Sequence, residues 1–70
     1  MKKVSYEKMA KLVNENCKGV TAKKSFWYGG AVCLKLYWRK EEDKETAVKF
    51  VNSYRTTSGN GFLIAMNRVL

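Results

Sequence analysis

The chain offers few side chains for acid–base or metal chemistry. It contains no histidine, which is the commonest general base and metal ligand. Its two cysteines, Cys17 and Cys33, do not make a zinc site, because such a site normally needs four ligands. Carboxylates gather at residues 41–45, where the start of a predicted helix explains them, since negative charge suits the helix dipole there. We therefore expect no catalytic site, no metal and no cofactor, and interpret the protein as a non-enzyme.

Two glycine-containing segments could suggest a phosphate-binding loop, but neither has the required context. Such a loop precedes a helix, so that the first amide groups of the helix point at the anion. The segment at residues 58–61 instead follows a predicted helix, and Gly29-Gly30 joins two predicted strands. Both are interpreted as turns.

Size and charge point to one small basic domain. Seventy residues are enough for a single domain, residues 1–70, with a modest core. The net charge is +8, and all of this excess lies in residues 1–40, whereas residues 41–70 are balanced. No apolar stretch approaches the ~20 residues of a membrane span, and no apolar segment follows Met1-Lys2-Lys3 as in a signal peptide. We expect a cytoplasmic protein, away from membranes, with reduced thiols and an anionic partner.

The spacing of apolar residues predicts a helix over residues 5–18, with Ser5 as its N-cap and Gly19 as a left-handed residue after its end. Residues 20–28 and 31–39 alternate in the manner of two strands around Gly29-Gly30. A two-residue loop would put Lys23 opposite Leu36 on the core face. A three-residue loop, 28–30, instead pairs Phe26 with Val32 and keeps the apolar residues together, so we predict that register.

A second helix is predicted from Asp43, its expected cap, to about Thr57, followed by a last strand within residues 62–70. The order α-β-β-α-β predicts an α+β fold, in which a three-stranded, mostly antiparallel sheet has both helices packed on one face. Two strand orders remain. We prefer 2-1-3, which makes the first strand central beside the apolar last strand, over 1-2-3, in which the last strand runs parallel to the second.

The other face of this sheet should be open and should carry the working surface. Its predicted members are basic and aromatic: Lys23, Trp27, Lys35, Tyr37 and Arg39. Lys23 falls opposite Lys35, an unfavourable like-charge pair that suggests use by a ligand. Lys8, Lys11 and Lys18 of the first helix are predicted to extend the basic surface.

Two kinds of partner fit this surface. Aromatic residues and arginine are favoured anchors at protein interfaces, so we favour a binding protein that docks onto an acidic protein surface, with a homodimer as a related outcome. A small basic chain of this kind would suit a phage- or plasmid-encoded inhibitor of a host complex. The alternative is single-stranded nucleic acid, whose bases stack on Trp27 or Tyr37 while lysine and arginine hold the phosphates.

Overall fold

The computed structural model describes residues 2–70; Met1, which the predicted domain 1–70 includes, lies outside them. The elements in chain order are β1 (Lys2–Lys3), α1 (Tyr6–Asn16), β2 (Val20–Phe26), a 3-10 turn η1 (Tyr28–Gly30), β3 (Val32–Trp38), α2 (Glu41–Asn52), β4 (Tyr54–Arg55) and β5 (Ile64–Arg68). The predicted α+β class and its order of two helices and three main strands are confirmed. The two-residue strands β1 and β4 are additional.

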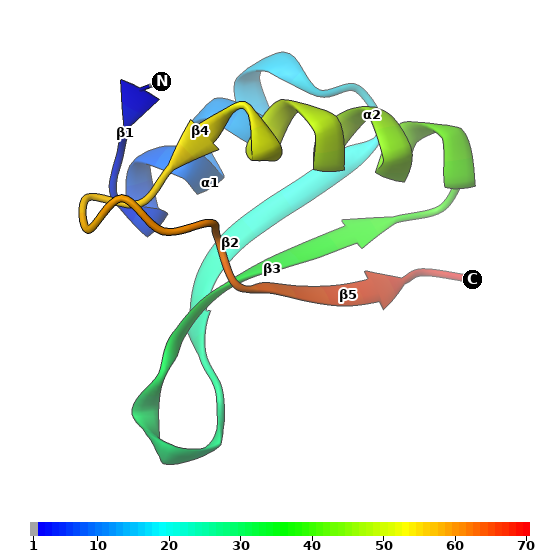
Figure 1. The fold of residues 1–70 in the computed structure, drawn as a ribbon. Coiled ribbons are helices and arrows are strands. Elements are labelled where there is room, and N and C mark those ends of the chain that lie inside the picture. The colour runs from blue at the N-terminus through cyan, green and yellow to red at the C-terminus, as the bar shows by residue number, and fades with distance from the viewer. Residues whose placement is uncertain (1) are drawn as a thin grey trace.

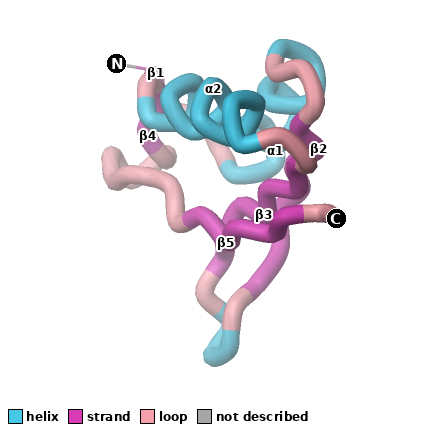
Figure 2. Tube along the Cα trace, turned by 90° about the vertical axis from the view of Figure 1, so that its right-hand side faces the viewer, coloured by secondary structure: helices cyan, strands magenta, loops and turns pink. Residues whose placement is uncertain are grey.

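Both helices lie on one side of the β2-β3-β5 sheet, as predicted (Figure 1). The core forms between these two layers, and Met9 and Val13 of α1, Leu34 and Leu36 of β3 and Val51 of α2 are at most 1% exposed. The hairpin of β2 and β3 extends well past the helices, so that its turn is far from the rest of the molecule in both views (Figures 1 and 2). Among residues 2–70, no helix is long and apolar enough to cross a membrane.

Helix α1 begins and ends close to where its sequence signals place it. Ser5 is the N-cap, and its hydroxyl accepts a hydrogen bond from the amide of Lys8 at 3.1 Å. Gly19 has a φ of +75°, the left-handed conformation that glycine adopts without strain. Glycine is also required for space, because a side chain there would collide with the carboxylate of Asp43 in α2.

The register of the hairpin is the predicted one. Val20 pairs with Trp38, Ala22 with Leu36 and Phe26 with Val32, which leaves Tyr28–Gly30 as a three-residue loop. Gly29 and Gly30 both have a φ of +84°, as this turn requires. The hydrophobic residues at the base therefore face the helices together, and the predicted pairing of Lys23 with Lys35 is confirmed.

The preferred strand order 2-1-3 is wrong. Strand β3 is central, and β5 pairs with it in parallel, so the sheet is mixed in the order 1-2-3 of its main strands. The outer edge of β2 is instead occupied by the side chain of Asn14 from α1. This amide accepts a hydrogen bond from Ala22 N–H at 2.7 Å and donates one to the Ala22 carbonyl at 2.8 Å. A strand cannot pair where these backbone groups are already bonded.

Helix α2 starts earlier and ends earlier than predicted. Lys40 is the N-cap, without a side-chain hydrogen bond, so the prediction of Asp43 as the cap is wrong. The helix ends at Asn52 rather than near Thr57, because Tyr54–Arg55 is extended and pairs in parallel with Lys2–Lys3. A contact with the start of the chain thus overrides the helical pattern of these residues.

The last strand, expected within residues 62–70, contains the apolar run Phe62-Leu63-Ile64-Ala65, which would suit a central strand or one covered on both faces. It lies instead at an edge of the sheet and covers only Ile64–Arg68. The apolar run has a different cause: the Phe62 ring packs edge-on against Tyr6 at 4.8 Å between centroids, and Ile64 packs against the core. Tyr6 also holds this segment through its hydroxyl, which accepts a hydrogen bond from Leu63 N–H at 2.9 Å.

Candidate functional site: the open face and the hairpin tip

The face of the sheet opposite the helices is built from alternate residues of its three strands. The cross-strand pairs Thr21–Tyr37, Lys23–Lys35 and Ser25–Cys33 lie on this side, and Ala65 and Asn67 of β5 continue it beyond Lys35 and Tyr37. We call these residues the open face. They are exposed or half-buried, with one exception. Cys33 is fully buried, although it does not belong to the hydrophobic core between the sheet and the helices.

Two lysines stand directly opposite each other on the open face. Lys23 and Lys35 are cross-strand partners, a spacing at which like charges repel. No carboxylate relieves this repulsion from within the sheet, because β2, β3 and β5 contain neither aspartate nor glutamate. An anion bound between the two ammonium groups would relieve it, and this makes the pair the electrostatic centre of the face.

Charge is separated between the two layers of the molecule. All six carboxylates of the chain lie in α1 and α2, together with four lysines, which gives the helices a balance of −2. Everything outside the helices carries ten cations and no carboxylate. Within α2, the Lys44 ammonium at 2.7 Å holds the pKa of Glu41 below its usual range, so this acid stays charged. Four of these cations, Lys23, Lys24, Lys35 and Arg68, lie in the β2-β3-β5 sheet without a carboxylate, so a polyanion is attracted more strongly to the sheet than to the helices.

Three consecutive aromatic residues form the end of the hairpin, and we call Phe26, Trp27 and Tyr28 the hairpin tip. Phe26 is 61% exposed, Trp27 is 42% exposed and Tyr28 is fully exposed. The turn itself, whose residues 28–30 project from the body, needs glycine but no aromatic ring (Figure 2). Exposed large rings at a projecting turn are a signature of contact with a partner.

Sequence reasoning found only Trp27 of this trio. Phe26 pairs with Val32 as predicted, but its side chain is not buried on the core face, because the helices leave it uncovered. The side chain of Lys24 marks the limit of their reach. Its ammonium lies 3.3 Å from Glu7 Oε1 of α1 and 5.4 Å from the centre of the Phe26 ring. The run of three rings beside two glycines was the signal that could have identified the tip.

The predicted site residues are only partly gathered. Lys23, Lys35 and Tyr37 lie together on the open face, and Tyr37 and Arg39 line a shallow hollow of about 400 Å³ at the base of the hairpin. Trp27 lies at the opposite end of the hairpin, about 20 Å away along the strands.

The lysines of the first helix are not part of this surface. Lys8 and Lys11 are exposed on α1, on the side away from its buried residues and hence away from the sheet. Lys18 lies in the connection to β2, next to the hollow lined by Gly19. The lysines that were expected to extend the basic surface therefore lie largely in the helix layer and not on the open face.

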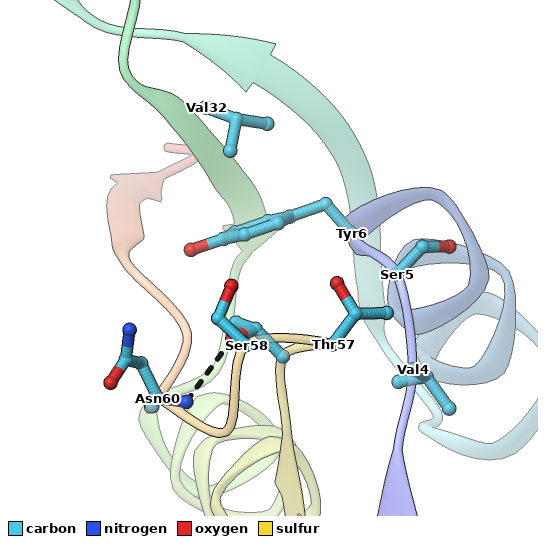
Figure 3. A pocket seen from close by; sticks show the side chains of 9 residues that line it. Val4, Ser5, Tyr6, Val32, Thr57, Ser58 and Asn60 are labelled. Atoms are coloured by element: carbon cyan, nitrogen blue, oxygen red, sulfur yellow. Dashed lines mark hydrogen bonds between the residues drawn. The ribbon is translucent and has the colours of Figure 1, made fainter.

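A second concavity lies between the start of α1 and the loop before β5, with a volume of about 300 Å³. Figure 3 shows Tyr6 between Val32 on one side and Thr57 and Ser58 on the other. The loop closes on itself through Thr56, whose hydroxyl accepts a hydrogen bond from Asn60 N–H at 3.2 Å. The lining side chains offer hydroxyl, amide and apolar groups, and Tyr6 is already used to hold Leu63. This concavity is explained by the packing of the loop.

The two cysteines are buried and unpaired. Burial raises the pKa of the Cys17 thiol, which disfavours the reactive thiolate. Among residues 2–70, no three histidine, cysteine or acidic side chains come together in a way that could hold a metal ion.

No protein-family model matches the chain, and no curated protein or solved structure proves similar to it.

Proposed function

We propose that this protein is a cytoplasmic, non-catalytic module that binds single-stranded nucleic acid across the open face and the hairpin tip. The observation that carries the proposal is the separation of charge: every carboxylate lies in the helices, while the sheet presents lysine and arginine beside aromatic rings. Single strands need both components, because phosphates are held by cations and bases stack on rings.

The arrangement of the residues supports a strand lying along the hairpin. Lys23 and Lys35 would hold a phosphate at the centre of the face, with Tyr37 one step toward the base and Trp27 toward the tip. Each base stacked on a ring contributes roughly 1–3 kcal/mol, so two or three stacks are enough for useful affinity. The exposed rings of Tyr28 and Phe26 would extend the contact beyond the sheet.

A protein target with an acidic surface, including the inhibitor role considered above, is the competing proposal. The same cations and aromatic rings could bind an acidic protein. A folded partner, however, would need a pocket for the hairpin tip, whereas the bases of a flexible single strand can stack separately on rings that lie far apart. The two proposals assign different ligands to the same residues, single-stranded nucleic acid or an acidic protein, so a direct measurement of nucleic-acid binding distinguishes them.

The test measures fluorescence anisotropy of labelled 20-nucleotide DNA and RNA strands against the purified protein at several salt concentrations. We expect affinity to fall steeply with salt, because bound counterions are released from the strand. The double variant Lys23→Glu with Lys35→Glu should lose at least tenfold in affinity. Trp27→Ala should lose about tenfold, consistent with one lost stack.

The matched control is Lys8→Glu with Lys11→Glu, which makes the same change in net charge on the helix layer. We expect it to weaken binding about threefold or less, since its charges are remote from the strand. Equal losses in the two double variants would contradict a site on the open face. Absence of binding to single or double strands at low salt, together with a nuclease-resistant protein captured from lysate through the same residues, would favour the acidic protein target instead.

A further inference from the structure

The two edges of the sheet differ in how their outer backbone groups are bonded, and this difference points to a second binding surface. The β2 edge is blocked at Ala22, because the Asn14 amide bonds both backbone groups of this residue. The other edge is β5, which pairs only with β3. Folded proteins usually protect such an edge with lysine, proline, a bulge or a covering element, since an unpaired strand recruits another.

The backbone of β5 has hydrogen-bonding groups to offer. Alternate residues of a parallel strand bond to its neighbour, and here Leu63 and Val69 bond to β3 through Leu34 N–H and the Trp38 carbonyl. By this alternation the N–H and C=O groups of Ile64, Met66 and Arg68 point away from β3. They form a row of donors and acceptors along the outer side of the strand.

An apolar groove follows the same edge on the helix side. Met66 is 49% exposed and forms the floor of a cavity of about 250 Å³, whose other wall is α2, with Val48 between the charged residues Glu45, Lys44 and Lys49. The helix contacts β2 and β3 and leaves β5 partly uncovered. The groove therefore combines a large apolar side chain with charges of both signs.

We infer that the occupant of this edge is a second copy of the chain, paired antiparallel through β5 about a two-fold axis at Met66. In that register Met66 opposes Met66 of the second copy, and Ile64 opposes Arg68, so that the arginines stay apart. Each of these pairs can exchange two backbone hydrogen bonds, about six in all. The outcome is a continuous six-stranded sheet.

The charges along the groove favour a second copy over an unrelated strand. A two-fold interface must be self-complementary, because each residue meets the same patch of the other subunit. Two α2 helices related by this axis run antiparallel. Because Glu45 and Lys49 flank Val48 in the wall of the groove, this arrangement brings Glu45 of one copy toward Lys49 of the other. The β3 strands of the two copies would be about 14 Å apart, with the two β5 strands between them. The two Met66 side chains, together with the long charged side chains, fill the space that remains beneath the helices.

This surface is independent of the proposed nucleic-acid site, because Met66 and the groove are on the helix side of the sheet. Pairing would nevertheless join two open faces into one, with Ala65 and Asn67 of each copy at the seam. A chain that does not bind nucleic acid can still form the dimer, and a chain that stays monomeric can still bind nucleic acid.

The test is sedimentation velocity of the purified chain from roughly 1 to 200 µM, without nucleic acid. We expect a concentration-dependent dimer. Met66→Lys, which places two ammonium groups at the axis, should raise the dissociation constant at least tenfold. Met66→Pro should act similarly, because it removes an outward N–H while leaving the bonds to β3 intact. Tyr28→Ala, an exposed change on the distant tip, should leave the constant unchanged.

A charge exchange tests the identity of the occupant. Glu45→Lys should weaken the dimer about fivefold, and adding Lys49→Glu in the same chain should restore it, because the reversed pair is again complementary across the axis. Circular dichroism shows whether each variant is folded, and if Met66→Pro unfolds the chain, Met66→Lys decides. A monomer at 200 µM, a dimer insensitive to Met66→Lys, or a double variant no better than Glu45→Lys would each overturn the inference.

Discussion

The base and the tip of the β2–β3 hairpin share one alternating pattern, yet the helices cover only the base. On the helix side at the base, Ala22 and Leu36 are paired and buried. On the same side at the tip, Phe26 is paired with Val32 but is 61% exposed. Lys24 lies at the boundary and reaches back to Glu7 of α1. Alternation thus decides which way a side chain points, and the reach of the second layer decides whether it is buried.

The largest expected effect is at the base. Leu36→Ala should lower the free energy of unfolding by about 2–5 kcal/mol, because it leaves a cavity among fully buried neighbours. In a domain whose total stability is roughly 5 kcal/mol or little more, this is a large fraction. Urea unfolding followed by circular dichroism measures the change. Leu36→Met, which nearly conserves volume, serves as the control and should cost less than about 1.5 kcal/mol.

A smaller effect is expected where the base meets α1. Asn14→Ala removes both hydrogen bonds to Ala22 and should lower the free energy of unfolding by about 1–3 kcal/mol, since partly buried backbone groups lose their partner. The control is Asn16→Ala in the same helix, whose side chain bonds only the Leu12 carbonyl of its own helix. If the two variants were equally stable, the Asn14 amide would not be what secures the β2 edge.

The smallest effect is expected at the tip. Phe26→Ala should change the free energy of unfolding by no more than about 0.5 kcal/mol, because the ring is mainly in solvent. Measured beside Leu36→Ala, on the same face of the same hairpin, it isolates the contribution of the helix layer. A loss above about 1.5 kcal/mol would mean that the tip is covered in solution, which would contradict its assignment as a free binding element.

Local signals placed most of the fold correctly. Ser5 and Gly19 bound the first helix, and the alternation around Gly29-Gly30 identifies the register, because a shift of one residue would place Lys23 opposite Leu36 on the core face. The candidate site followed from the same argument, since Lys23, Lys35 and Tyr37 are placed by register alone. These features depend on residues close together in the sequence.

The errors occurred where distant segments compete for the same place. The last strand was expected to pair with the outer edge of β2, but there the Asn14 side chain bonds the backbone of Ala22, eight residues away in the sequence. The second helix stopped early because Tyr54–Arg55 pairs with the start of the chain. No periodic pattern in the sequence encodes either contact.

The sequence by itself determined the class of fold, the hairpin register and the basic, aromatic character of one face, because helix caps, glycine turns and alternation act over a few residues. The tertiary structure decided the rest. The length and position of the helices left Phe26, Trp27 and Tyr28 uncovered, and the Asn14 contact blocked the β2 edge at Ala22 while β5 stayed open. Burial and edge pairing depend on which elements lie next to each other, and that is fixed only when the whole chain is packed.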